Sequence, residues 1–114
     1  MGVDLTLLPV SHFHVRDGKW DAMCKTQLAL GRQSLCWEAI DELKPEKIPE
    51  GSDVLAANLT PDGKQLKKDP YGGDYTWVTA ERLAAVLERF KPQAGAAAYL
   101  RSLPPDTKII LHWH

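Results

Sequence analysis

Alternating apolar and polar residues predict a β-strand at each end of the chain. Residues 3–10 read VDLTLLPV and residues 107–114 read TKIILHWH. Side chains at i and i+2 of a strand share a face, so each segment has one clearly apolar face. These two faces comprise Val3, Leu5 and Leu7 at the start and Ile109, Leu111 and Trp113 at the end. Because both segments are apolar enough to be covered, we expect the two strands to be central or adjacent in a sheet.

A hairpin is predicted around Asp17-Gly18, because Asp-Gly between two alternating segments is a strong hairpin signal. Its first strand is expected to continue from residues 12–15. After the turn, every second residue falls on one mostly apolar face, formed by Trp20, Ala22, Cys24, Thr26, Leu28 and Leu30. We therefore predict one half-buried strand from residue 20 to residue 30, closed by Gly31.

Apolar residues spaced three and four apart predict helices in three places. The first follows Ser34, a residue type that caps helix N-termini, and it ends before Pro45. A third covers about residues 93–103. The clearest lies between them, after Thr79, with an apolar stripe of Leu83, Val86, Leu87 and Phe90.

The order of these elements predicts an α+β fold. Short strands are also expected within residues 53–59 and 75–78, and the polar residues 64–74 are expected to form the longest loop. Strands and helices that do not alternate regularly are typical of a sheet with helices segregated to one face. We predict one small domain, residues 1–114, with an antiparallel or mixed sheet and about three helices packed on one face.

Composition narrows the classes of function. The chain has 114 residues, 25% of them charged, and 14 basic against 15 acidic residues give a formal charge of -1. This charge argues against a protein that grips duplex DNA by counterion release. No apolar run approaches the roughly 20 residues needed to span a bilayer. We expect a cytoplasmic protein with neither duplex DNA nor a membrane as partner.

The two cysteines favour a structural role. Cys24 and Cys36 each have apolar neighbours, which is typical of buried free thiols that behave as small hydrophobic residues. A disulfide or a reactive thiol is the alternative. The sequence contains no nucleophile elbow, paired-acid motif or triad, so we predict no catalytic residues, and catalysis has little support.

Four histidines form two His-x-His pairs, one near each end of the chain: His12, His14, His112 and His114. On a strand, each pair points two imidazoles to one face. If the two pairs converge, four nitrogen ligands could hold zinc, in a structural site or, with one position open to water, a hydrolytic one. The alternative is that all four are surface residues opposite a core face that contains Phe13 and Trp113. No cofactor is expected unless the zinc site exists.

A glycine- and aromatic-rich segment, residues 69–77, precedes the clearest helix. Glycines allow a ligand to approach the backbone, aromatic rings offer stacking faces, and nearby lysines can contact phosphate. This combination suits a nucleotide, with a candidate ligand-binding set of Tyr71, Gly72, Gly73, Tyr75, Trp77, Lys67 and Lys68. The alternative is a glycine turn whose tyrosines cover the edge of the core.

Three segments carry a resemblance to other proteins: MGVDLTLLP at the start, YTWVTA at residues 75–80 and LPPDTKIILHWH at the end. In these segments, about half of the chain, the sequence resembles a group of small uncharacterised proteins from phages and prophages. The resemblance carries no catalytic or binding residue. It implies a context, the cytosol of a bacterial host, where small phage accessory proteins often counter host defence.

The resemblance leads to one expected function and two alternatives. The expected function is non-catalytic binding that antagonises host defence, preferably by sequestering a small signalling nucleotide, and a homo-oligomer would be compatible with it. The first alternative is an inhibitor that binds a host defence protein directly, as anti-CRISPR proteins do. The second is a metal-binding domain or hydrolase that uses the histidine pairs.

Overall fold

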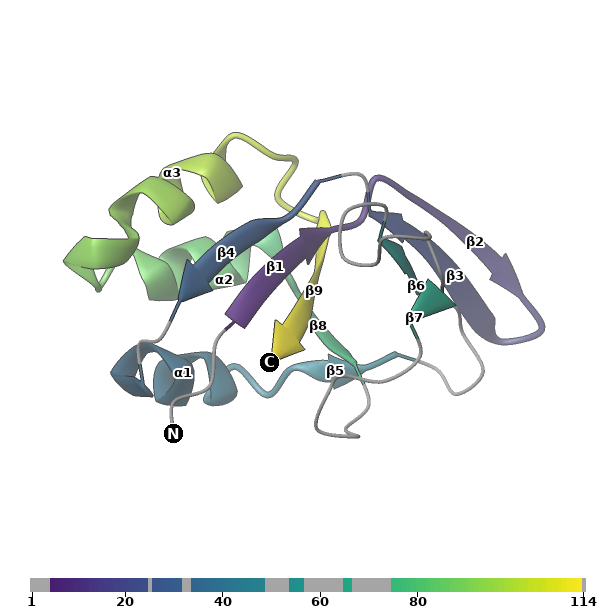
Figure 1. Ribbon diagram of the computed structural model, residues 1–114, viewed down its shortest axis with the longest axis horizontal. Coiled ribbons are helices and arrows are strands. Elements are labelled where there is room, and N and C mark those ends of the chain that lie inside the picture. Colours follow the sequence, from purple (N-terminus) through teal and green to yellow (C-terminus); the bar gives the residue numbers. More distant parts are fainter. Residues whose placement is uncertain are drawn as a thin grey trace.

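The computed structural model of the chain describes residues 5–24, 26–31, 34–48, 54–56, 65–66 and 75–113. A five-stranded sheet in the order β4-β1-β9-β8-β5 forms its middle layer (Figure 1). These strands are β1 (Leu5–Pro9), β4 (Leu28–Gly31), β5 (Glu46–Lys47), β8 (Thr76–Thr79) and β9 (Lys108–Trp113). The helices are α1 (Ser34–Asp41), α2 (Ala80–Leu87) and α3 (Ala94–Arg101), with a 3-10 turn, η1, at Lys91–Gln93. The α+β prediction is confirmed.

The two terminal strands are neighbours at the centre of this sheet, as the sequence predicts. β9 is the middle strand, and it pairs antiparallel with β1 from Leu5 opposite Trp113 to Pro9 opposite Ile109. Every residue of β1 is buried. A strand covered on both faces reads as a nearly continuous apolar run, which is why Leu7 and Leu8 are adjacent in the sequence.

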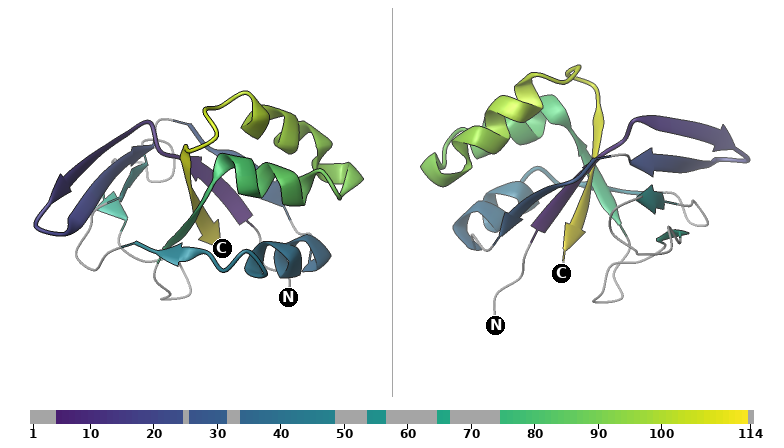
Figure 2. Two further views of the ribbon diagram at one scale, coloured as in Figure 1. Left: turned by 180° about the vertical axis from the view of Figure 1, so that it is seen from behind. Right: turned by 45° about the horizontal axis from the view of Figure 1, so that its top comes forward.

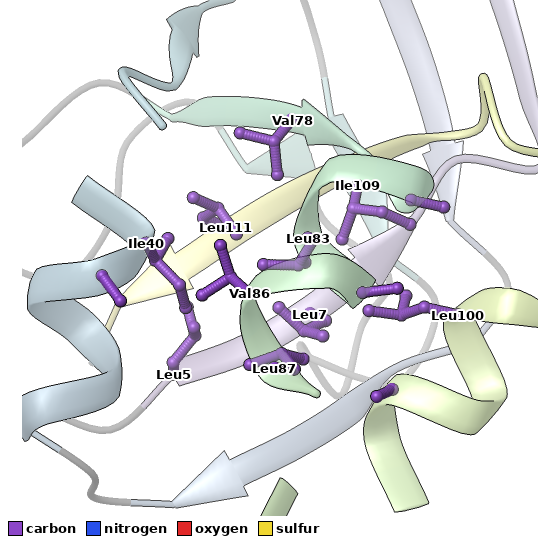
Figure 3. Close-up of a cluster of buried hydrophobic side chains, with 14 of the residues drawn as sticks. Leu5, Leu7, Ile40, Val78, Leu83, Val86, Leu87, Leu100, Ile109 and Leu111 are labelled. Atoms are coloured by element: carbon purple, nitrogen blue, oxygen red, sulfur yellow. The ribbon is translucent and has the colours of Figure 1, made fainter. Parts of the chain in front are cut away.

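All three α-helices cover one face of the sheet (Figure 2). Their apolar side chains interdigitate with alternate residues of the strands, including Leu5, Leu7, Ile109 and Leu111 (Figure 3). The stripe predicted for the clearest helix is largely confirmed, since Leu83, Val86 and Leu87 of α2 are buried. Thr79 caps this helix and accepts a hydrogen bond from the backbone N–H of Arg82.

Phe90 corrects the prediction of that stripe. The helix ends at Leu87, three residues earlier, and Phe90 has an extended backbone where η1 begins. Its side chain is only partly buried against the helix-side core. Pro92, in the first turn of η1, prevents α2 from continuing through this region, because it cannot donate the intrahelical hydrogen bond to the carbonyl of Glu88.

The other face of the five-stranded sheet is covered by a second sheet, which the sequence does not predict. Its strand order is β2-β3-β6-β7. These strands are β2 (His12–Arg16), β3 (Lys19–Cys24), β6 (Val54–Ala56) and β7 (Gln65–Leu66). Leu8 and Ile110 of the first sheet pack against Ala22, Cys24 and Val54 of the second.

The strand predicted from residue 20 to residue 30 is in fact two strands in different sheets. β3 ends at Cys24, and β4 begins at Leu28 in the five-stranded sheet. Ala22 and Cys24 are buried between the sheets, whereas Leu28 and Leu30 pack against the helix-side core. Alternation with a period of two continues through the crossing, so the pattern alone does not reveal it. The hairpin itself is confirmed, with positive φ angles of 48° at Asp17 and 76° at Gly18.

Two further predictions concern the middle of the chain. β6 confirms a short strand within residues 53–59, and β7 occupies part of the predicted loop at residues 64–74. The rest of that loop lies outside the described residues. Within the described part of the chain, no helix is both long and apolar enough to cross a membrane.

Candidate functional site

The candidate site lies where β8 and β9 face hairpin β2–β3. Of the predicted ligand-binding residues, Tyr75 and Trp77 are described, and both lie on the side of the sheet that faces the hairpin. The others, Tyr71, Gly72, Gly73, Lys67 and Lys68, lie outside the described residues. For this predicted site, the structure therefore describes the surroundings of Tyr75 and Trp77 alone.

Tyr75 forms a buried pair with His112. The Tyr75 hydroxyl lies 3.0 Å from Nδ1 of His112, within hydrogen-bond distance, and the two rings stack at 5.7 Å between centroids and 27° between planes. Tyr75 is 2% exposed and His112 is 9% exposed. Thr6, directly opposite His112 in the β1–β9 ladder, is buried as well. Because burying a polar group is costly without a partner, the Tyr75–His112 bond fixes how β9 meets the start of β8.

Trp77 belongs to a second, more exposed cluster. The ammonium group of Lys108 lies 5.2 Å from the centroid of the Trp77 ring and 4.5 Å from that of the Phe13 ring. Such distances are those of cation–π contacts. Trp77 and Lys108 are half-buried, and Phe13 is 50% exposed. We call Phe13, Trp77 and Lys108 the aromatic–lysine cluster; it joins β2, β8 and β9, which are far apart in the sequence.

Two members of this cluster are not predicted from the sequence as binding residues. Phe13 is expected in a core face only if the histidines are surface residues, but half of Phe13 is exposed, and the pattern predicts no role for Lys108. The periodicity of strand β9 places Lys108 on the same face as Ile110 and His112. Only the packing of the hairpin against β8 and β9 brings Phe13 to it.

The described histidines do not converge. His12 and His14 are exposed on β2, on the face opposite Phe13, whereas His112 is buried between the two sheets. Among the described residues, no three His, Cys, Asp or Glu side chains form a group that could hold a metal ion. The four-histidine zinc site is therefore not supported by these three residues. His114 lies outside the described residues.

Cys24 is a buried free thiol, as predicted. Its Sγ is placed to donate a hydrogen bond to the carbonyl oxygen of Leu8, at 3.7 Å. Burial removes water from the thiolate and raises the pKa of Cys24 to about 12. A thiol with so high a pKa is almost wholly protonated near neutral pH and is a poor nucleophile. The side chain of Cys36 lies outside the described part of the structure.

Hairpin β2–β3 carries the large apolar side chains that are exposed in the described residues. They are Phe13, Val15 and Met23, which are 50%, 63% and 40% exposed. Phe13 and Val15 share the face that carries Ala22, whereas Met23 is opposite His12 on the other face. The right-hand view of Figure 2 shows the hairpin extending away from the helical layer.

No protein-family model, curated protein or solved structure matches the chain. The resemblance to phage and prophage proteins thus stays a prediction, and any function must be argued from the residues themselves.

Proposed function

We propose that this protein is a phage-type accessory protein that antagonises host defence by binding a small signalling nucleotide without catalysis. One observation supports the ligand class above all. Two aromatic rings and a lysine, from three different strands, meet in the aromatic–lysine cluster at the side of the five-stranded sheet that faces the hairpin. Aromatic faces bind bases by stacking, and an ammonium group binds phosphate.

Lys108 would change partners when a nucleotide binds. A cation–π contact at an exposed site is worth about 0.5–1 kcal/mol. A charge-assisted hydrogen bond to a phosphate is about twice as strong as a neutral one. A bound phosphate therefore competes with the two aromatic rings for the ammonium group of Lys108. Once Lys108 turns to the phosphate, the ring face that it covers becomes available to the base. Phe13 is the better stacking candidate, because half of it is already exposed.

The remaining predicted residues take different parts in this proposal. Tyr75 is buried and holds His112, so we assign it a positioning role at the start of β8 rather than a stacking role. Tyr71, Gly72, Gly73, Lys67 and Lys68 precede Trp77 in the chain, and their contact with the ligand stays a prediction. The proposal involves no chemical step.

The test is calorimetric titration with cyclic mononucleotides, cyclic dinucleotides and ADP-ribose-type compounds. For a compound that binds, Phe13→Ala should weaken affinity about tenfold, since base stacking is worth about 1–3 kcal/mol. Lys108→Gln should weaken binding of the phosphorylated compound but should not weaken binding of its nucleoside, which has no phosphate to contact. Met23→Ala is the matched control, an exposed apolar truncation on the other face of the same hairpin, and should bind as the parent does.

An inhibitor that binds a defence protein directly is the second candidate, and one observation favours it. Val15 and Met23 add exposed apolar surface on both faces of the hairpin, as residues of a protein interface do. If no nucleotide binds, and Val15→Ser alone abolishes protection of phage in cells with an active defence system, this candidate replaces the first. The two candidates thus give opposite results in the same pair of assays.

A further inference from the structure

Hairpin β2–β3 has a second face that the proposed nucleotide site does not use. His12 is opposite Met23 and His14 is opposite Asp21, whereas Phe13 is opposite Ala22. Ala22 is buried between the sheets, and Phe13 contacts Lys108. Because successive side chains of a strand alternate between faces, His12 and His14 both lie on the outer face of the hairpin.

Both imidazoles are available to a ligand. His12 and His14 are exposed, and within the described part of the chain neither side chain makes a hydrogen bond or an ion pair. They occupy positions i and i+2 of a regular strand that the β2–β3 ladder holds from His12 to Arg16. The strand fixes the separation of the two Cβ atoms and places both side chains on one face, so both imidazoles can turn toward one ion.

We propose that His12 and His14 together bind one divalent transition-metal ion on the outer face of the hairpin. Each imidazole supplies one nitrogen ligand, and water or a donor from another molecule fills the other positions. Imidazole suits zinc, copper and nickel, whereas magnesium and calcium prefer oxygen ligands. The expected order of affinity is copper above nickel and zinc, with no binding of magnesium or calcium at the same concentration.

The site is open rather than structural. Asp21 is opposite His14, but among the described residues no three His, Cys, Asp or Glu side chains form a group that could hold a metal ion, whereas structural zinc is almost always held by four protein ligands. His112 is buried in the other part of the fold and bonded to Tyr75, so it takes no part. The ion is thus not needed for folding, and stripping it with a chelator should leave the circular dichroism spectrum unchanged.

The experiment is titration of Zn²⁺, Cu²⁺ or Mg²⁺ into metal-free protein that carries no histidine tag, followed by calorimetry. Variants His12→Ala and His14→Ala test the pair, and His114→Ala tests the only histidine that lies outside the described residues. Residues that merely orient metal ligands are worth about 10–100-fold in affinity, so loss of one ligand should weaken binding at least about tenfold. His114→Ala should bind zinc as the parent does.

Residue-resolved spectra make the result independent of affinity. Substoichiometric Cu²⁺ is paramagnetic and should broaden the imidazole signals of His12 and His14 first, with the amide signals of β2 and β3, and leave those of His112 sharp. Unchanged zinc affinity in both His12→Ala and His14→Ala would overturn the proposal, as would no measurable binding by the parent protein. Loss of binding in His114→Ala alone would move the site to the C-terminus. None of these outcomes depends on nucleotide binding, because that site is on the opposite face of the hairpin.

Discussion

The two faces of the five-stranded sheet are built differently. The helix side buries Leu5, Leu7, Ile109 and Leu111 against apolar side chains of α1, α2 and α3 (Figure 3). The side that faces the second sheet has a smaller apolar cluster, and it also buries Thr6, His112 and the hydroxyl of Tyr75. The helix side therefore has the larger apolar core, whereas the sheet side combines a smaller apolar cluster with buried polar groups.

This difference has a physical basis. Packing of purely apolar side chains gains free energy in proportion to buried area and requires no directional contacts. Buried polar groups gain little on balance, but they must be paired in one geometry. Among the described residues of the helical layer, Gln93 is buried and polar. Its side-chain amide donates a hydrogen bond to the backbone carbonyl of Leu30. On the sheet side, the Tyr75 hydroxyl and Nδ1 of His112 form such a pair.

Removal of strand β9 should have the largest effect, because it belongs to both faces. Deletion of residues 109–114 takes away the central strand, its ladders with β1 and β8, and buried residues of both clusters. We expect no cooperative thermal unfolding and an expanded or aggregated product by size-exclusion chromatography. A truncated protein that stays monomeric and unfolds cooperatively would contradict the assignment of β9 as the centre of the fold.

The helix-side core should respond strongly to single truncations. Leu87 is fully buried, so Leu87→Ala should lower the free energy of unfolding by about 2–5 kcal/mol, through lost burial and the cavity left behind. Phe90 lies beyond the end of α2 and is only partly buried. Phe90→Ala should therefore cost less than Leu87→Ala, although it removes more atoms. Urea titration of both variants measures the difference, and the reverse order would show that Phe90 belongs to the core.

The buried Tyr75–His112 bond should have an intermediate effect. Tyr75→Phe removes one hydroxyl and leaves Nδ1 of His112 without this contact in a buried position, which should cost about 1–3 kcal/mol. Tyr99→Phe is the matched control, since its hydroxyl lies 3.4 Å from Oγ1 of Thr26 at an exposed position. We expect chemical denaturation to show nearly parental stability for the control. Equal losses in the two variants would mean that burial of the pair contributes nothing special.

The reactivity of Cys24 tests the packing of the two sheets without any substitution. Its pKa is raised from 9.0 to about 12, so at pH 8 the folded protein has about 1,000-fold less Cys24 thiolate than the unfolded chain, because three pKa units are a factor of 10³. Peptide mass spectrometry should therefore find Cys24 unmodified by iodoacetamide in the folded protein and modified in concentrated urea. Rapid modification of the native protein would show that the two sheets open readily.

Local sequence patterns accounted for most of the helix side. The stripe of Leu83, Val86 and Leu87 identified α2, and the alternation in the terminal segments identified two central strands. These predictions succeeded because the relevant periods, 3.6 and 2, come from backbone geometry and are visible within about ten residues. The end of α2 was placed too late, since Phe90 continues the stripe even though the backbone has already left the helix.

The candidate site could be anticipated only in fragments. The sequence singled out Tyr75, Trp77 and the histidines, but it grouped Tyr75 with a nucleotide site and His112 with a metal site. The structure instead joins Tyr75 to His112 and places Trp77 beside Lys108 and Phe13. These partners are separated by tens of residues, and no local period connects them.

By itself, then, the sequence determined the elements whose apolar faces repeat regularly: the terminal strands, the Asp17-Gly18 hairpin and helix α2. Only the tertiary structure decided that the chain changes sheets between Cys24 and Leu28, and that a second sheet covers the other face of the first. The reason is that an apolar period shows that a face is buried but does not identify what covers it. Which side chains meet there depends on pairing between distant strands, and this pairing separates His112 from His12 and His14 and brings Phe13 to Lys108.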